Sequence, residues 1–300
     1  MRLSVVTLLD VVRASGGAER LAARLTMALD PDRFDRTLCF TRPPHPQDRE
    51  AEAALAEEAR AAGVRVLTLY RGSTWDLRAW APLWSLLRNE HVDILHAHMF
   101  GSNVWGTIIG RLAGVPVVIA HEHGWSFTGQ PLRRLLNREV VGRNTDLYLA
   151  VSRDYRRKMI SVEGISPCRV LFLPNGIPPL AAADGEHDVR AELGIPPDAP
   201  LLAAVGVLRP EKALDVLLKA MALLAPELPD LRALLIGDGP ERERLESLAR
   251  EIGLDGRVIF TGNRTDVPLT TKGQLAAVVL DVVTGLLDEQ GLGAETKGGT

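Results

Sequence analysis

The strongest limit on the fold comes from short apolar segments that alternate with longer amphipathic ones. The first apolar segment, residues 3–9, is continuous, as is typical of a strand buried on both faces. The alternation occurs about seven times before residue 177, which is the pattern of a doubly wound parallel sheet. It stops in a proline-containing stretch at residues 174–179 and resumes after residue 200. We therefore predict an α/β protein with two domains.

The expected strands span residues 3–9, 36–40, 64–69, 93–97, 115–120, 147–151 and 169–173, and then 201–207, 231–236 and 258–261. The first expected helix ends near residue 29. The others span residues 48–62, 77–88, 102–112, 131–141 and 153–162, and then 211–224 and 240–252. The N-terminal domain is predicted to cover residues 1–177, and residues 178–195 form a linker. A partial second domain covers residues 196–268, and residues 269–300 form a divergent tail.

Composition excludes several classes of protein. The formal net charge of -3 gives no overall reason to expect nucleic acid as a partner. The two cysteines, Cys39 and Cys168, form no motif and indicate a reducing compartment. No apolar run reaches the roughly 18–20 residues of a membrane span. We expect a cytoplasmic protein.

A basic loop after one expected strand is the clearest candidate for an anion site. Strand 201–207 contains Gly206 near its end and is followed by Arg209, Pro210 and Lys212 before the next expected helix. Free backbone N–H groups and the dipole at a helix N-terminus both favour a bound anion. The two cationic side chains add full positive charge at the same place.

Two glycine-containing turns also follow strands. Gly16 and Gly17 follow the first strand, and Gly237 and Gly239 follow strand 231–236. Without a side chain, a glycine lets the backbone approach a ligand closely. The alternative is a simple turn in each case, and the first turn lacks the full spacing of a dinucleotide-binding motif.

Histidines end two neighbouring strands of the predicted sheet. His96 and His98 end the fourth strand, and His121 and His123 end the fifth. The carboxyl ends of parallel strands lie at one edge, where ligands bind. Three interpretations remain open: acid–base work on a hydroxyl substrate, a metal site, and structural histidine.

The region after residue 130 is rich in cationic side chains. These are Arg133, Arg134, Arg138, Arg143, Arg153, Arg156, Arg157 and Lys158. Clustered on one rim, they would hold the protein peripherally against an anionic membrane surface. The alternative is that they cover solvated helix faces.

Taken together, these stretches resemble the retaining family 4 glycosyltransferases, which have the GT-B fold. The resemblance covers residues 1–268 in the family's order and is carried by matching segments at residues 16–20, 93–98, 121–123, 151–152, 173–177, 206–212, 236–240 and 258–262. It implies two Rossmann-like domains facing each other across a cleft, and an enzyme that transfers a sugar from a nucleotide sugar to a glycan or lipid-linked hydroxyl acceptor.

The resemblance also implies roles for individual residues. Arg209 and Lys212 would hold the donor diphosphate and stabilise the charge that develops on it. Gly16 and Gly17, and also Gly237 and Gly239, would approach the donor with their backbones. His98 would lie near the transferred sugar or the acceptor hydroxyl, and His121, His123 and Ser152 would lie on the acceptor side. No metal, cofactor or protein nucleophile is expected.

The sequence departs from the family pattern in two places. Val207 stands where many relatives have arginine, and Arg209 is the candidate to replace it. After residue 268 the family's Glu-Gly-x-Pro loop and its second glutamate are not recognisable. We therefore hypothesise a truncation or a shifted reading frame near residue 268. A non-catalytic nucleotide- or sugar-binding remnant and a metal-dependent hydrolase remain as competing functions.

Overall fold

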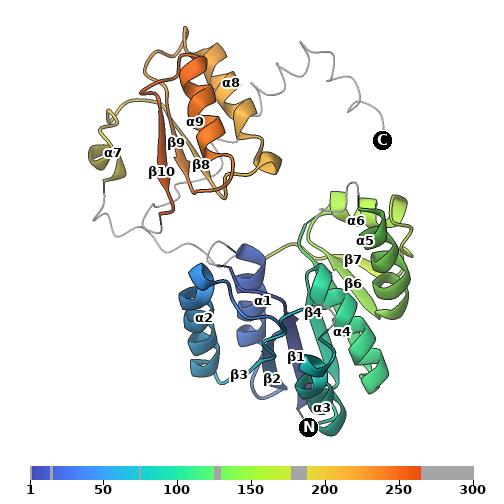
Figure 1. The fold of residues 1–300 in the computed structure, drawn as a ribbon. Helices are drawn as coiled ribbons and strands as arrows, with labels where there is room; N and C mark the ends of the chain where they lie inside the picture. The colour runs from blue at the N-terminus through green and yellow to red at the C-terminus, as the bar shows by residue number, and fades with distance from the viewer. Residues whose placement is uncertain (1, 14–15, 74–75, 125–129, 177–187, 265–300) are drawn as a thin grey trace. The chain divides into compact units, whose positions relative to one another are not determined.

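The structure is a computed structural model that describes residues 2–13, 16–73, 76–124, 130–176 and 188–264. The chain divides into two compact units, Met1–Pro178 and Pro179–Thr300, which are described separately below. Figure 1 shows both units as α/β structures. The expected tail at residues 269–300 lies outside the described residues, as does most of the expected linker.

The first unit is built on a seven-stranded parallel sheet in the order β3-β2-β1-β4-β5-β6-β7. Its strands are β1 (Leu3–Leu9), β2 (Phe34–Phe40), β3 (Arg65–Thr68), β4 (Ile94–His98), β5 (Val117–Glu122), β6 (Leu147–Ala150) and β7 (Val170–Phe172). From β1 the chain adds β2 and β3 on one side of the sheet and then adds β4 to β7 on the other side of β1, so the strand order reverses between β1 and β4. Because all pairs are parallel, the carboxyl ends of the strands share one edge of the sheet.

Helices cover both faces of this sheet, as the doubly wound pattern requires. They are α1 (Gly17–Ala28), α2 (Arg49–Ala61), α3 (Ala81–Asn89), α4 (Phe100–Ala113), α5 (Pro131–Leu136) and α6 (Arg153–Ser161). Leu9 packs in a core with α1 and α2, whereas Leu8 packs in a second core with α3 and α4. Successive strand residues point to opposite faces, so a continuous apolar strand supplies both cores.

The second unit has a three-stranded parallel sheet in the order β10-β9-β8. Its elements are α7 (Val189–Glu192), β8 (Leu201–Val205), α8 (Leu214–Leu224), β9 (Arg232–Ile236), α9 (Arg242–Glu251) and β10 (Val258–Gly262). One core fills it, in which Leu218 of α8 and Leu245 of α9 pack against Leu235 of β9. This core is smaller than the cores of the first unit taken together, so less surface is buried for each residue ordered.

Every expected strand and helix is present, and three expectations need correction. The helix expected over residues 211–224 begins only at Leu214, because Pro210–Lys212 forms a 3₁₀ turn and Ala213 is left-handed at φ 49°. The helix expected over residues 131–141 is α5 followed by a π-helical segment, Asn137–Gly142. Part of the expected linker is the short helix α7, which Asp188 caps by accepting from two backbone N–H groups.

Candidate functional site

The basic loop of the second unit connects β8 to α8. Arg209 precedes the 3₁₀ turn, and its side chain is half-exposed, with Glu211 3.8 Å away. An exposed pair at this distance contributes little, so the guanidinium remains available to a ligand. Lys212 folds back over the end of β8, where its Cε lies 3.7 Å from the position that a Cβ on Gly206 would take. Both cations therefore lie between the end of β8 and the start of α8.

The N-terminus of α8 strengthens this site for anions. Ala213, which caps the helix, makes no side-chain hydrogen bond to it. The first N–H groups of an α-helix have no carbonyl four residues back, and an Ala cap offers them no side chain. Here the N–H of Val216 donates to the carbonyl of Ala213 at 3.0 Å, and those that precede it are left for a ligand or water. The helix dipole and the two cations thus act on the same volume.

Gly237 and Gly239 hold the neighbouring loop against the basic loop. A Cβ on Gly237 would lie 2.0 Å from the carbonyl oxygen of Gly206, and one on Gly239 would lie 2.4 Å from that of Leu208. The N–H of Leu208 also donates to the carbonyl of Asp238 at 3.0 Å. Backbone packing between the two loops therefore accounts for both glycines. Their predicted approach to a ligand stays a prediction.

Gly16 and Gly17 open α1 at the carboxyl edge of the larger sheet. Gly16 is the N-cap, and a Cβ there would lie 2.3 Å from a carboxylate oxygen of Glu19. The Glu19 carboxylate therefore lies over the first turn of α1, the place expected for a phosphate, and burial raises its pKa. Around Gly17, by contrast, a Cβ would meet nothing within 4 Å.

The four histidines at the ends of β4 and β5 form one cluster. His98 is opposite His121 in the parallel register, so His96, His98, His121 and His123 all point to the same face. Ring centroids lie 4.1 Å apart for His96 and His98 and 4.3 Å apart for His121 and His123. Nδ1 of His98 lies 3.0 Å from Nε2 of His123. The sequence prediction that these histidine pairs converge is confirmed.

Burial keeps these imidazoles neutral. It lowers the pKa of His96 and of His123 to about 4 and that of His121 to about 2, and it holds the pKa of His98 well below its usual range. Mutual repulsion among the rings adds to this effect for His96, His98 and His121. A neutral imidazole has one N–H donor and one lone pair, so the cluster can donate to or accept from a ligand without carrying charge.

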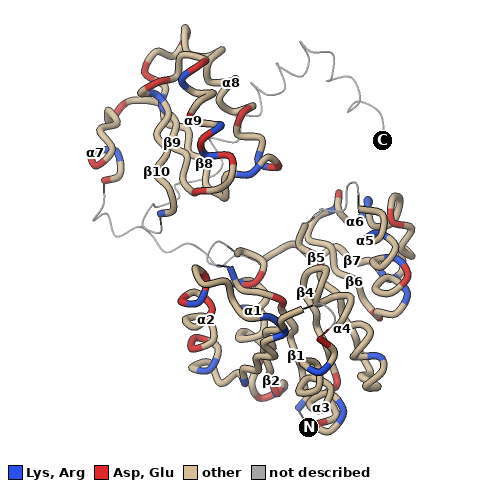
Figure 2. Tube along the Cα trace, in the orientation of Figure 1, with Lys and Arg blue, Asp and Glu red and all other residues tan. Residues whose placement is uncertain are grey.

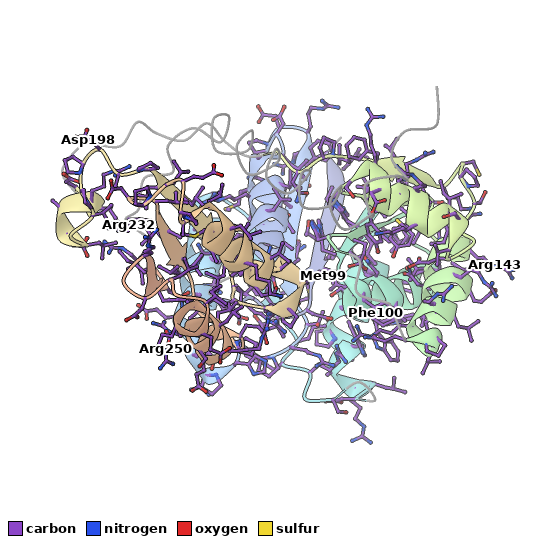
Figure 3. The ribbon with its side chains drawn as sticks, turned by 90° about the horizontal axis from the view of Figure 1, so that it is seen from above. Met99, Phe100, Arg143, Asp198, Arg232 and Arg250 are labelled. Carbon is purple, nitrogen blue, oxygen red and sulfur yellow. The ribbon has the colours of Figure 1, made fainter. Side chains whose placement is uncertain are left out.

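Asn103 of α4 fixes the end of β5 from the opposite face of the sheet. Its Nδ2 donates to the carbonyl of His121 and to Oε2 of Glu122, and its Oδ1 accepts from the N–H of His121. Met99 connects β4 to α4 at φ 68°, and its N–H donates to the same His121 carbonyl at 2.9 Å. Figure 3 shows Met99 and Phe100 at this junction. The backbone of His121 is thus held by hydrogen bonds from Asn103 and from Met99.

Sequence reasoning missed a second polar group at the same edge. Asp10 follows β1, and its Oδ1 accepts from Thr41 Oγ1 at 2.6 Å and from Ser102 Oγ at 3.1 Å. Arg71, which is almost fully buried, brings Nη2 to 3.6 Å from Asp10 and lies over the ring of Trp80. The sequence signal that could have revealed Asp10 is its position, because it is the polar residue that directly follows the apolar first strand.

Ser152 has a structural role in this arrangement. It is the N-cap of α6, where its Oγ accepts from the N–H of Tyr155 at 3.0 Å. Capping explains a serine at this position, and contact with an acceptor stays a prediction.

The eight cationic residues of the basic region all have partners within the chain. Figure 2 shows them interleaved with acidic residues around α5 and α6. Glu139 pairs with Arg138 and Arg143, and Asp154 pairs with Lys158 and more distantly with Arg157. The others donate to backbone carbonyls or lie over an aromatic ring: Arg133, Arg134, Arg153 and Arg156. The region therefore consists of partly solvated helix faces on which the cationic side chains pair with nearby groups of the same chain.

Two family models match the chain. The model described as Glycosyltransferase Family 4 matches residues 15–179, which is more than half of the 300 residues. The chain belongs to glycosyltransferase family 4. The model described as Glycosyl transferases group 1 matches residues 186–281, of which residues 186–187 and 265–281 lie outside the described part. The resemblance stated from the sequence is thereby confirmed.

Several curated relatives are named D-inositol 3-phosphate glycosyltransferase. The one from Thermomonospora curvata is 33% identical over 57% of this chain and 45% of its own length. The one from Nocardioides is 30% identical over 55% of this chain and 40% of its own length. An Escherichia coli UDP-Gal:alpha-D-GlcNAc-diphosphoundecaprenol alpha-1,3-galactosyltransferase is 25% identical over 70% of this chain and 57% of its own length. The chain thus spans about half the length of these relatives.

Solved structures confirm the fold. Alr3699/HepE of Anabaena, crystallised in complex with UDP, matches with a TM-score of 0.69 at 21% identity, over 89% of this chain and 71% of that one. The lipopolysaccharide outer core galactosyltransferase WaaB in its apo form matches with a TM-score of 0.59 at 16% identity, over 88% and 69%. The α/β fold predicted for this family 4 chain is that of known glycosyltransferases.

Proposed function

We propose that the chain transfers a sugar from a nucleotide-sugar donor to a hydroxyl group of a glycan or lipid-linked acceptor, with retention of configuration. The observation that carries this proposal is the basic loop of the second unit. Arg209 and Lys212 lie beside the uncapped N-terminus of α8, which suits a diphosphate. Family membership supplies the reaction class, and the loop supplies the charge that the reaction needs.

In the proposed reaction, the bond between the anomeric carbon and the diphosphate oxygen breaks. A bond to the acceptor oxygen forms on the same face of the sugar, and the acceptor proton passes to the departing phosphate. Negative charge grows on the diphosphate as this happens. Preorganised cations and N–H groups aimed at that charge lower the barrier, which is the role we assign to Arg209 and Lys212. This role requires no metal, cofactor or protein nucleophile.

The residues of the first unit have proposed roles on the donor and acceptor sides. Gly16 and Gly17 approach the phosphates, His98 lies beside the transferred sugar, and His121 and His123 face the acceptor. The proposed roles of the histidines are supported by their convergence, as neutral imidazoles, at the carboxyl edge of the sheet. The Glu19 carboxylate must turn away before a phosphate reaches the first turn of α1, because it lies over Gly16.

Uridine is the nucleoside that we propose for the donor. What supports it is that Anabaena Alr3699/HepE was crystallised with UDP and with UDP-glucose. The E. coli relative is named for UDP-Gal and a diphosphoundecaprenol acceptor, which supports a lipid-linked acceptor. The relatives from Nocardioides and Thermomonospora curvata are named for D-inositol 3-phosphate, so a phosphorylated polyol is the second acceptor to test.

A non-catalytic function is the alternative proposal. The specific observation in its favour is that the Glu-Gly-x-Pro loop and its second glutamate are not recognisable after residue 268. A chain with the diphosphate loop and without those carboxylates would bind a nucleotide sugar and turn it over slowly or not at all. Donor turnover therefore separates the two proposals, since both predict binding.

The direct test is a thermal-shift and turnover screen of UDP- and GDP-sugars in EDTA. We expect UDP-sugars to stabilise the chain, because a ligand that binds only the folded state shifts unfolding by mass action. The variant Arg209→Ala/Lys212→Ala should lose this shift. Lys219→Ala is the matched control, since Lys219 is also exposed and lies on α8, where it pairs with Asp215 at 3.5 Å. Equal shifts in the double variant and the control would refute the role of the loop.

We also propose peripheral contact with an anionic membrane through α5. Leu132 and Leu135 are exposed beside Arg133 and Arg134, which is the composition of an interfacial segment. No described helix has both the length and the apolar character needed to cross a bilayer. Sedimentation with phosphatidylglycerol vesicles tests the contact, and Leu132→Ser/Leu135→Ser should reduce it. Equal binding to purely zwitterionic vesicles would argue against it.

A further inference from the structure

The Asp10 carboxylate is contacted from the connections of three neighbouring strands. Asp10 directly follows β1, and the strand order around it is β3-β2-β1-β4 (Figure 1). Its three partners follow the other strands: Arg71 follows β3, Thr41 follows β2, and Ser102 lies in the first turn of α4, after β4. Each of the three is at most 1% exposed. The strand order reverses between β1 and β4, and open α/β sheets bind ligands at such a point.

The two oxygens of this carboxylate have different surroundings. Oδ1 accepts from the hydroxyls of Thr41 and Ser102, at 2.6 and 3.1 Å, and lies 3.6 Å from Nη2 of Arg71. Among the described residues, none donates to Oδ2, and 22% of the Asp10 side chain is exposed. One oxygen therefore fixes the side chain in place, and the other is available to a ligand.

Gly101 makes room for the free oxygen. It lies in the first turn of α4, although glycine has a low helix propensity. A Cβ at this position would lie 2.0 Å from Oδ2 and 3.1 Å from Cγ of Asp10. Figure 3 labels Met99 and Phe100, which mark the start of this helix. Space for the carboxylate, rather than helix formation, accounts for a glycine at this position.

The charges around Oδ2 favour a neutral hydrogen-bond donor. The carboxylate itself lies at the start of α4, so it repels an anion that the helix N-terminus would otherwise attract. A cationic ligand gains little, because the buried guanidinium of Arg71 already balances the charge of Asp10. A carboxylate oxygen only accepts hydrogen bonds, and a hydroxyl group is a neutral donor that suits it.

We propose that Oδ2 of Asp10 binds a ring hydroxyl of the acceptor, so that a neutral part of a sugar or cyclitol ring lies at this point. This inference rests on the proposed sugar transfer and adds Asp10 to its acceptor side. Asp10 follows β1 beside the end of β4, which carries His98. The hydroxyl that it binds is not the one that reacts, because the departing phosphate takes the proton of that one. Asp10 is therefore a binding residue.

The most informative variant is Gly101→Ala, because its new Cβ displaces Oδ2 without removing any charge. Alanine also favours the helix, so the fold should be retained. Gly72→Ala is the matched control, since Gly72 is exposed and a Cβ there would meet nothing within 4 Å. Asp10→Asn is a second variant, which replaces the free accepting oxygen by an amide that donates. Circular dichroism checks that each variant folds.

The probes are inositol 3-phosphate and N-acetylglucosamine joined through an α-linked diphosphate to a short alkyl chain, since relatives are named for such acceptors. Saturation-transfer NMR without donor gives their dissociation constants. We expect the unchanged chain and Gly72→Ala to bind one probe equally well. Gly101→Ala and Asp10→Asn should bind it more weakly by roughly 10–100-fold, the value of a hydrogen bond to a charged group. The KM for that probe should rise similarly, while hydrolysis of a UDP-sugar by water should stay unchanged.

Three results would overturn the inference. The first is equal affinity of Gly101→Ala and Gly72→Ala for the probe. The second is absence of binding of both probes to the unchanged chain. The third is a loss of UDP-sugar hydrolysis in Gly101→Ala as large as the rise in KM, which would indicate general damage. Failure of the proposed sugar transfer has a different signature: neither transfer nor hydrolysis occurs, while probe binding still depends on Asp10.

Discussion

Replacing Glu122 by glutamine should change how the stability of the first unit depends on pH. The pKa of Glu122 is raised to about 8, mainly by burial and to a smaller extent by the charge of Glu163. Hydrogen bonds from the N–H of His123 and from Asn103 oppose this shift without cancelling it. Glutamine has the same shape and can still accept from Asn103, but it cannot ionise. The substitution therefore isolates the titration.

The sign follows from proton uptake. The pKa of this carboxyl is raised in the folded state, from 4.5 to about 8. Between these pH values the folded chain holds a proton that the unfolded chain has lost. Its contribution to stability is full below pH 4.5 and is lost as pH rises to 8. The loss is about 1.4 kcal/mol per pH unit, which gives on the order of 5 kcal/mol over the window. Glu122→Gln should match the unchanged chain near pH 4.5 and exceed it increasingly towards pH 8.

Tryptophan fluorescence during urea denaturation measures the first unit alone. All five tryptophans of the chain lie within Met1–Pro178, at positions 75, 80, 84, 105 and 125. Glu90→Gln is the control, because Glu90 is exposed and its hydrogen bonds from Arg65 lower its pKa. That variant should lose a little stability at neutral pH and approach the unchanged chain in acid, the opposite trend. Parallel pH curves for Glu122→Gln and the unchanged chain would refute the reasoning.

Three further predictions concern glycine positions. Ala213→Gly should raise the free energy of opening that hydrogen exchange measures in the second unit by about 1 kcal/mol, because φ 49° strains alanine. Ala220→Gly, within α8, should lower this free energy. Gly237→Ala should speed exchange in both loops and weaken nucleotide binding, since the new Cβ collides with the carbonyl of Gly206; unchanged exchange would contradict this. Gly17→Ala should leave the fluorescence-detected unfolding unchanged, because the space is open, and should weaken nucleotide binding only if the backbone there approaches the phosphates.

The order of strands and helices could be predicted because each has its own sequence period. Leu3–Leu9 is apolar except for Ser4 and Thr7, and this near-continuity indicates a central parallel strand whatever its neighbours are. The convergence of the histidines followed in the same way from two strand ends and the alternation of side chains. Local patterns of this kind do not depend on contacts between distant segments.

Other features of the site depend on contacts that no local pattern contains. The serine that donates to Asp10 lies in the first turn of α4 and the threonine directly follows β2, 92 and 31 residues away in the sequence. The sequence predicts a ligand role for Gly237 because the group that requires glycine there, the carbonyl of Gly206, follows a different strand of the sheet. The left-handed Ala213 gave no signal, since alanine is not among the residues that routinely adopt positive φ.

The contact between the two glycine-containing loops of the second unit has a practical consequence for protein engineering. The N–H of Glu241 and the carbonyl of Asp238 both bond to Leu208, and Gly237 leaves no room between the loops. Residues 206–213 therefore keep their conformation only together with residues 237–241. Grafting the first segment alone into another α/β scaffold would transfer its charges without their geometry. The smallest portable module is the pair of loops with β8 and β9 beneath them.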